Sequence, residues 1–291
     1  MPAIFQLLAD NSAFFLSMLF ILGLLVGSFL NVVIHRLPIM LERGWQREFQ
    51  QYFQSDEPQP AEETYNIITP RSRCPKCQSE ITALQNIPVV SWLVLGGKCK
   101  QCKTPISPRY PIVELITGLV SVLVGWQFGF SSACTLALIF SWCMIALTAI
   151  DIDKMLLPDQ ICLPLLWLGL LTSINSVFVN STDALIGAAV GYLSLWSLYW
   201  AFKLLTGKEG MGYGDFKLLA AIGAFVGWQQ LPIVIVLSSF VGAVIGIVHL
   251  KMQGKDQSQP IPFGPYLAIA GWITLLYGDW IADQYWNWML N

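Results

Sequence analysis

Charged residues are scarce in this sequence. Only 12% of its 291 residues are Asp, Glu, Lys or Arg, about half of the share that is usual in soluble domains. A soluble protein of this size must cover a large surface with polar groups, and this chain has too few of them. Its net charge of -2 also lacks the positive excess that favours nucleic acids, so we expect no nucleic acid among its partners.

Several familiar catalytic motifs are absent. The chain contains no H-E-x-x-H zinc-protease helix, no G-x-S-x-G serine elbow and no P-loop. The glycines of residues 210–214 miss the G-x-G-x-x-G dinucleotide pattern, because Asp215 occupies its last position. The sequence therefore offers none of these signatures.

Apolar residues are abundant and come in long blocks. They make up 55% of the chain, and at about 20 residues per crossing the length allows about eight membrane helices and one sizeable polar segment. We predict an all-α polytopic membrane protein with the lipid bilayer as a partner. The sixth span is short and rich in glycine, so it is expected to be tilted or to cross only partly. The predicted spans are 13–34, 112–130, 132–150, 160–179, 183–205, 215–229, 231–250 and 263–283.

Basic residues are distributed very unequally about these spans. Ten of the sixteen Lys and Arg residues lie between Arg36 and Arg109, and the other six lie on the same side of the predicted spans. The segments on the opposite side contain none. Because the positive side of a membrane protein faces the cytoplasm, both termini are expected outside it. The first apolar stretch has no basic residue before it, which favours a permanent helix over a signal peptide.

The polar segment between the first two spans divides the chain. We expect residues 1–35 to form the first transmembrane helix, residues 36–111 a cytoplasmic domain, and residues 112–291 a transmembrane core of about seven helices. The early part of the cytoplasmic domain, residues 42–63, is acidic and rich in Gln; it is either a solvated surface or a binding surface for basic peptides.

Pairs of glycines four residues apart occur in four of the predicted spans. Such pairs let helix backbones approach closely, although glycine is common in membrane helices and chance is the alternative. The pairs are Gly23/Gly27, Gly187/Gly191, Gly223/Gly227 and Gly242/Gly246.

Four of the seven cysteines form two C-x-x-C pairs in the polar segment. Cys74 and Cys77 are followed, after 21 residues, by Cys99 and Cys102. Two such pairs can place four thiolates tetrahedrally around one Zn²⁺ ion. The alternatives are two disulfides, which a reducing cytoplasm disfavours, and a redox C-x-x-C, which does not explain two pairs. We predict a structural zinc site, because four thiolates leave no open coordination position.

Two acidic residues at membrane depth are the candidates for catalysis, because a charge in the bilayer is costly. Asp151 follows an apolar run, and Asp215 ends the glycine-rich segment 210–215 just before another apolar run. Two carboxylates in a partly dry cavity share one proton, so that one acts as base on a water and the other as acid. Gly212 and Gly214 would let the backbone beside Asp215 lie flat against a neighbouring segment or an extended peptide.

Other ionisable residues have plainer interpretations. Asp159 follows a proline and is typical of a helix N-cap. Asp153 points away from Asp151 on a helix and is expected to be an interfacial charge. Glu114 can pair with a loop arginine, and His249 is a lone histidine at a helix end.

Taken together, these motifs resemble those of bacterial type IV prepilin peptidases, which belong to the GxGD class of intramembrane aspartyl proteases. The resemblance covers nearly the whole chain. It rests, in order, on Gly27-Ser-Phe-Leu-Asn31-Val-Val-Ile-His35-Arg36-Leu-Pro38, the four cysteines with Arg109-Tyr-Pro-Ile-Val-Glu114, Asp151-Ile-Asp-Lys-Met-Leu-Leu-Pro158-Asp159, Gly212-Tyr-Gly214-Asp215 and Pro262-Phe-Gly-Pro265-Tyr.

The resemblance implies a bifunctional enzyme, a leader peptidase and N-methyltransferase. Asp151 and Asp215 match the family's two catalytic aspartates, and the four cysteines match a tetracysteine motif of many members. The substrates would be precursors of type IV pilins and type II secretion pseudopilins. The enzyme would cut them after a Gly at the cytoplasmic membrane face and methylate the new N-terminus with S-adenosylmethionine. Its place would be the bacterial inner membrane, with both termini periplasmic.

Two other functions are open to such a chain. An ion- or proton-coupled transporter with a zinc-stabilised cytoplasmic domain would favour a repeat between the chain halves, and the sequence shows none. A scaffold that binds pilins without cutting them would not need the pair of aspartates. The site of S-adenosylmethionine and the oligomeric state are not evident from the sequence.

Overall fold

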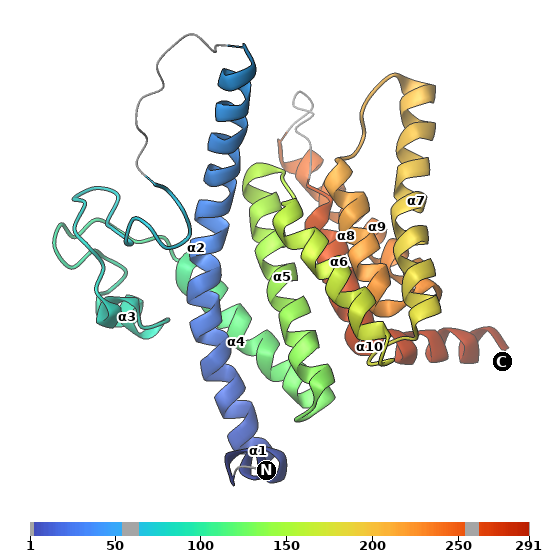
Figure 1. Ribbon diagram of the computed structural model, residues 1–291, viewed down its shortest axis with the longest axis horizontal. Coiled ribbons are helices and arrows are strands. Elements are labelled where there is room, and N and C mark those ends of the chain that lie inside the picture. Colours follow the sequence, from blue (N-terminus) through green and yellow to red (C-terminus); the bar gives the residue numbers. More distant parts are fainter. Residues whose placement is uncertain (1–2, 54–63, 254–261, 291) are drawn as a thin grey trace. The chain divides into compact units, whose positions relative to one another are not determined.

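Helices dominate the computed structural model, which describes residues 3–53, 64–253 and 262–290. Within these residues the only extended backbone pairing is two isolated β-bridges. Part of the acidic stretch, residues 54–63, and the side chain of His249 lie outside the description. In chain order (Figure 1), the elements are α1 (Ala3–Asp10), α2 (Ser12–Phe53), η1 (Ala83–Asn86), α3 (Val90–Val94), α4 (Arg109–Phe128), α5 (Ser132–Lys154), α6 (Asp159–Ser173), α7 (Ser181–Thr206), α8 (Tyr213–Val226), η2 (Trp228–Gln230), α9 (Leu231–Gln253) and α10 (Gly264–Leu290).

Each predicted span overlaps one helix, so the all-helical, multi-pass prediction is confirmed. Five of the described segments are long and apolar enough to cross a membrane: α2, α4, α5, α7 and Trp228–Ile245. Helices α6 and α8 have only 15 and 14 residues, which is about 21–23 Å of helix against a hydrocarbon core of about 30 Å. A count of eight complete crossings therefore stays a prediction.

The chain forms two compact units, Met1–Phe130 and Ser131–Asn291. In the N-terminal unit α2 packs along α4. A Cβ atom added to Gly23 would lie 2.8 Å from the Thr117 carbonyl oxygen, and one added to Gly27 would lie 2.7 Å from the Glu114 Cα. The predicted close packing is confirmed here, because only glycine leaves room for the neighbouring backbone.

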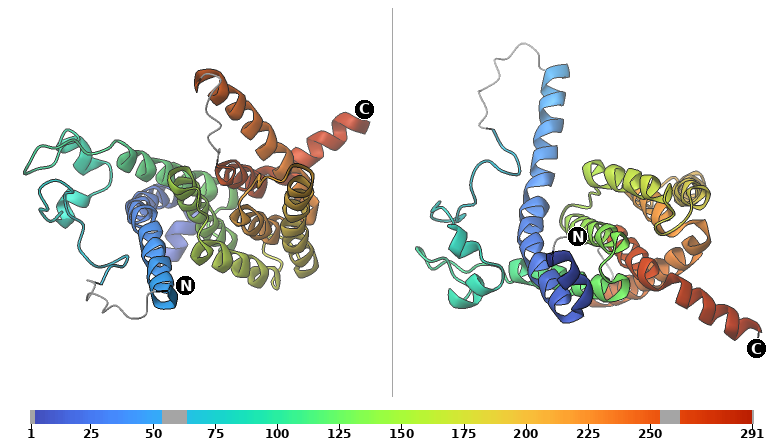
Figure 2. Two further views of the ribbon diagram at one scale, coloured as in Figure 1. Left: turned by 90° about the horizontal axis from the view of Figure 1, so that it is seen from above. Right: turned by 60° about the horizontal axis from the view of Figure 1, so that its bottom comes forward.

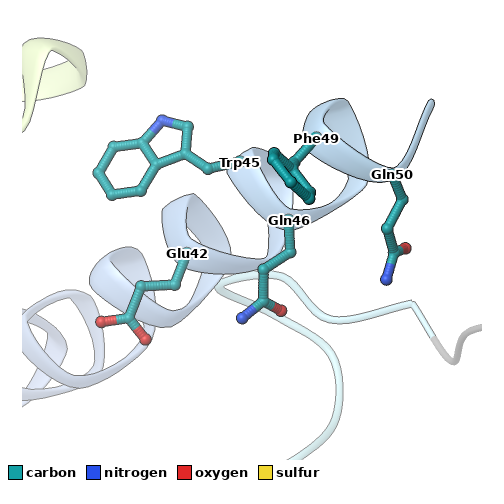
Figure 3. Close-up of a pocket in the computed structure, with 5 residues that line it drawn as sticks. All are labelled: Glu42, Trp45, Gln46, Phe49 and Gln50. Carbon is teal, nitrogen blue, oxygen red and sulfur yellow. The ribbon is translucent and has the colours of Figure 1, made fainter. Parts of the chain in front are cut away.

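Helix α2 continues far beyond its predicted span. Its 42 residues make about 63 Å of helix, twice the bilayer core. On the extension, Trp45 and Phe49 are exposed beside a shallow hollow of about 450 Å³, and Figure 3 shows Glu42, Gln46 and Gln50 on the same helix. Since one helix supplies every residue that lines the hollow, it is a surface feature and not an enclosed site.

Helix α8 is the centre of the C-terminal unit. It packs against α6, α7 and α10, and 11 of its 14 residues are buried. A Cβ atom on Gly187 of α7 would collide with the Gly223 carbonyl oxygen, and one on Gly191 would lie 2.6 Å from the Leu219 carbonyl oxygen. The predicted close packing at Gly187/Gly191 is thus confirmed, and it seats α7 directly on the backbone of α8.

The last part of α10 leaves this bundle. Figures 1 and 2 show it projecting away from helices α5–α9, and its Trp280, Trp286 and Trp288 side chains are exposed. Tryptophan is enriched where a membrane meets water, so the composition of this segment suits an interfacial position.

Candidate functional site

The structure brings Asp151 and Asp215 together in the C-terminal unit. Asp151 lies in the last turn of α5, Asp215 lies in the first turn of α8, and their exposed fractions are only 5% and 6%. The two carboxyl groups are close enough for the charge of one to act on the other. Since both are buried, that interaction is stronger than it would be in water.

The two carboxyl groups have different surroundings. Oδ2 of Asp151 accepts a 3.0 Å hydrogen bond from the amide N–H of Gly264, at the start of α10. Oδ1 of Asp215 is buried and accepts no hydrogen bond from any residue that the structure describes. The Gly264 N–H fixes the position of that Asp151 oxygen. No donor provides the same help to that oxygen of Asp215.

Leu157 fills the space between the segments that carry the two aspartates. A Cβ atom on Gly214 would lie 2.7 Å from the Leu157 Cβ, and one on Gly264 would lie 2.5 Å from Asp151 Oδ2 and 3.0 Å from Leu157 Cδ2. A Cβ atom on Gly212 would meet Asp215 Oδ2 at 3.6 Å, which is ordinary contact. Of the two predicted glycines, only Gly214 lies so close to a neighbouring residue that a larger side chain would collide with it.

Asp159 does not cap α6, so the N-cap prediction for it is wrong. The cap position is Pro158, and Asp159 is the first helical residue. Its carboxylate oxygens lie 2.7 and 2.8 Å from Nζ of Lys217 on α8. The fold brings Lys217 to Asp159 from 58 residues away in the chain. The sequence around Asp159 therefore could not predict this ion pair.

The remaining acidic candidates lie apart from the aspartate pair. Asp153 is exposed, as expected for an interfacial charge. In the N-terminal unit, Glu114 is buried and its Oε2 accepts a 2.7 Å hydrogen bond from the amide N–H of Val89. This bond ties the polar loop to α4.

The depth of the aspartate pair follows from aromatic contacts between α7 and α8. The ring of Tyr199 lies 5.3 Å from that of Tyr213 and 5.7 Å from that of Phe216, which places Asp215 at the level of Tyr199. Helix α7 continues to Thr206, about 10 Å further along its axis. The pair therefore lies about two turns below the end of α7.

In the N-terminal unit, the four predicted cysteines form one cluster. Their sulfur atoms lie within 4.8 Å of one another, with 3.7 Å between Cys74 and Cys102 and 4.0 Å between Cys77 and Cys99. All four are free thiols, since a disulfide needs about 2.05 Å. Tetrahedral zinc with Zn–S distances of about 2.3 Å separates its sulfurs by about 3.8 Å. The four residues therefore fit a zinc ion.

Two matching knuckles build this cluster. Cys74 accepts a backbone hydrogen bond from Gln78, and Cys99 accepts the same bond from Lys103; both donors have a φ of 57°. The isolated bridges Arg73↔Glu80 and Lys98↔Pro105 close the two turns in the same way. The sequence motif predicts the ligands, but it does not reveal this repeated turn.

Hydroxyl groups lie beside one sulfur of each knuckle. Ser79 Oγ lies 3.0 Å from the Cys77 sulfur, and Thr104 Oγ1 lies 3.2 Å from the Cys102 sulfur. The side-chain and backbone hydrogen bonds with Thr104 lower the pKa of Cys102 to about 6. Backbone hydrogen bonds with Cys102 and Gln101 also lower the pKa of Cys99. The sequence analysis missed both hydroxyls, because Ser and Thr are too common in turns to stand out.

The fold is that of a multi-pass helical membrane protein. Its two candidate sites are the buried pair Asp151 and Asp215 and a cluster of four cysteines that could bind a metal ion. Comparison with family models matches residues 21–128 to the bacterial peptidase A24 N-terminal domain and residues 138–247 to the type IV leader peptidase family. No solved structure matches the chain.

Curated relatives are similar over nearly the whole chain. The prepilin leader peptidase/N-methyltransferase of Aeromonas salmonicida strain A449 is 61% identical over 272 residues, covering 93% of this chain and 94% of the relative. The protein of the same description from Pseudomonas aeruginosa is 54% identical over 285 residues, covering 98% of each chain. The chain therefore belongs to the type IV prepilin leader peptidase/N-methyltransferase family, and the predicted family and enzyme class are confirmed. This membership does not support the transporter and scaffold alternatives.

Proposed function

We propose that Asp151 and Asp215 hydrolyse the leader peptide bond of prepilins and pseudopilins, after a Gly at the cytoplasmic face of the bacterial inner membrane. The observation that carries this proposal is that two buried carboxyl groups, from α5 and α8, lie on either side of the packing of Leu157 against Gly214 and Gly264. One of them accepts a backbone N–H, and one oxygen of the other faces no donor among the described residues. The names of the relatives supply the class of substrate.

The asymmetry of the pair supports a division of roles. The amide N–H of Gly264 donates to Asp151 and supports its carboxylate form, whereas Oδ1 of Asp215 has no donor among the described residues. In the proposed mechanism the shared proton therefore resides on Asp215. Asp151 takes a proton from a water, whose oxygen attacks the carbonyl carbon of the scissile bond. Asp215 gives its proton to the carbonyl oxygen. The amide nitrogen then receives the proton held by Asp151, and the C–N bond breaks. One hydroxyl group on the former carbonyl carbon returns its proton to Asp215, which restores the starting pair.

The depth of the site supports a substrate that is anchored in the membrane. Asp215 lies about two turns below the end of α7, whose last turn carries Lys203. A lysine at a helix end extends its ammonium toward the aqueous boundary, so the aspartates lie just beneath that boundary. A bond between a basic leader and an apolar helix would lie at the same depth.

The distribution of basic residues supports the orientation. Lys154, Lys203 and Lys217 lie at the same helix ends as the aspartate pair, which makes this end cytoplasmic. Eight crossings with both termini periplasmic follow if α6, α8 and α10 count as crossings in addition to the five candidate spans. The cysteine cluster then also faces the cytoplasm.

The two further groups in this proposal have separate roles. Cys74, Cys77, Cys99 and Cys102 would hold a structural Zn²⁺, since their four sulfurs match its tetrahedral spacing. S-adenosylmethionine would supply the methyl group that the description of the relatives as N-methyltransferases implies. The residues that would hold S-adenosylmethionine are not assigned.

Substitution of each aspartate tests the proposal. Asp151→Asn and Asp215→Asn should each lower the rate of prepilin cleavage by at least about 10²–10⁴-fold, the usual contribution of general acid–base catalysis. Cleavage is followed by the size shift of a purified prepilin. Asp153→Asn, an exposed aspartate on the same helix, is the matched control and should cut normally. Normal cleavage by Asp151→Asn or Asp215→Asn would remove that residue from the mechanism.

Methylation provides the check on folding. Both Asn variants should still transfer a methyl group to a pilin whose leader has already been removed, because the proposal gives that reaction no need for the aspartates. Loss of both activities would instead indicate misfolding.

A further inference from the structure

An ion pair joins the two segments that carry the aspartates. Nζ of Lys217 on α8 lies 2.7 and 2.8 Å from the two carboxylate oxygens of Asp159 on α6. The pair connects residues that lie 58 positions apart in the chain. Asp159 is the first residue of α6, and Lys217 is the fifth residue of α8.

Within the described part of the chain, no hydrogen bond or ion pair joins Lys217 or Asp159 to Asp151 or Asp215. Lys217 is two residues beyond Asp215, and two positions on a helix turn a side chain by about 200°. The Lys217 side chain therefore leaves α8 on the side opposite to the Asp215 carboxyl group. Lys217 would therefore influence catalysis indirectly, by fixing the position of the α8 backbone that carries Asp215.

The other partner lies at the end of the segment that begins with Asp151. Between them, Met155 ends α5 in the left-handed conformation, with a φ of 50°, and Leu157 occupies the space against Gly214 and Gly264. Fixing Asp159 to Lys217 therefore fixes both ends of the link that presses Leu157 against the glycines beside the two aspartates.

We propose that the Lys217–Asp159 ion pair sets the approach of Asp151 and Asp215, and that both are positioning residues for peptide cleavage. The inference rests on the proposed role of the two aspartates. The side chains of Lys217 and Asp159 are 31% and 48% exposed, and such a pair adds little to overall stability. Its loss should change alignment far more than folding.

Kinetics of the full-length enzyme test this inference. With a purified prepilin as substrate, Lys217→Met and Asp159→Asn should each lower kcat by about 10–100-fold, the cost of a misplacement near 1 Å. KM should change by less than about twofold, because the lost interaction is not with the substrate. Lys217→Arg should keep most of the activity, since arginine can also bind both oxygens of a carboxylate.

A second pair in the same unit provides a matched control. Lys203 lies 2.7 Å from Glu209, and its side chain is 33% exposed, so it resembles Lys217 in both distance and exposure. Lys203→Met should cut prepilin at a nearly normal rate. An equal loss in Lys203→Met and Lys217→Met would show a general effect of losing a charge, and would overturn the inference.

The double variant Asp159→Asn/Lys217→Met separates the remaining outcomes. It should be no slower than either single variant, because both remove the same interaction. Additive losses, or a raised KM with normal kcat, would overturn the positioning role. Normal cleavage by Lys217→Met with no cleavage by Asp215→Asn would refute only this inference, whereas activity in Asp215→Asn would refute the proposed function.

Discussion

The amide nitrogen of Gly264 donates a 3.0 Å hydrogen bond to Oδ2 of Asp151, which joins the start of α10 to the end of α5. The bond gives one carboxyl group of the pair a fixed position and a hydrogen-bond donor. Because a Cβ atom on Gly264 would lie 2.5 Å from that same oxygen, the contact requires glycine. The glycine of the Pro262-Phe-Gly-Pro265 motif is therefore the residue that holds the Asp151 carboxyl group in place.

Gly264→Ala should therefore displace the Asp151 carboxyl group. The added methyl group would lie 2.5 Å from Oδ2, which is too close, so the carboxyl must shift relative to the amide, and prepilin cleavage should fall by about 10–100-fold. Gly44→Ala is the control, because a Cβ atom on Gly44 meets nothing within 4 Å. Cleavage rates measured on both purified variants decide the matter, and a normal rate in Gly264→Ala would contradict the assigned contact.

Gly214→Ala and Gly212→Ala should differ in their effect on cleavage. A Cβ atom on Gly214 collides with the Cβ of Leu157 at 2.7 Å, whereas one on Gly212 makes ordinary contact with Asp215 at 3.6 Å. We expect Gly214→Ala to lose at least about tenfold more activity than Gly212→Ala, since it separates two backbones and not only a flexible side chain. Equal losses would show that conformation, and not space, requires these glycines.

Gly187→Ala should destabilise the C-terminal unit. Its Cβ atom would collide with the Gly223 carbonyl oxygen on α8, and overpacking of this kind costs about 1–3 kcal/mol. Thermal unfolding in detergent, followed by circular dichroism, should show a lowered midpoint relative to Gly44→Ala. An unchanged midpoint would mean that α7 and α8 can separate without cost.

Zinc content should depend on the four clustered cysteines. The purified protein should carry about one zinc per chain, and Cys77→Ser or Cys102→Ser should lose most of it, as measured by atomic emission. Cys143→Ser, a free thiol in α5, should keep the metal. Zinc retained in both cluster variants would exclude the site.

A structural role also predicts how the metal-free protein behaves. Removal of zinc by a chelator should expose residues 64–108 to proteases, because folding of such a loop is coupled to metal binding. If the loop resists proteolysis equally with and without metal, the ion is not structural.

Much of this protein could be predicted from local patterns. Apolar blocks predict where the long helices begin to within about three residues, since a membrane helix satisfies its own backbone and needs no distant partner. They do not predict where α2 ends, because its extension to Phe53 is polar. The spacing of the cysteines predicts their cluster, because the ligands of one knuckle lie on a single short turn. The errors are also instructive. Asp159 follows a proline as an N-cap would, yet its carboxylate is held by Lys217 of another helix.

By itself, the sequence determined the class of protein and its helical, multi-pass character, and it predicted the orientation by charge and the residue types that carry chemistry. Only the tertiary structure decided that Gly264 binds Asp151, that Leu157 lies between the two aspartate segments, and that Lys217 pairs with Asp159. The physical reason is distance along the chain. Periodicity and motif spacing report interactions within a few turns, whereas these contacts join segments that meet only when α5, α6, α8 and α10 pack together.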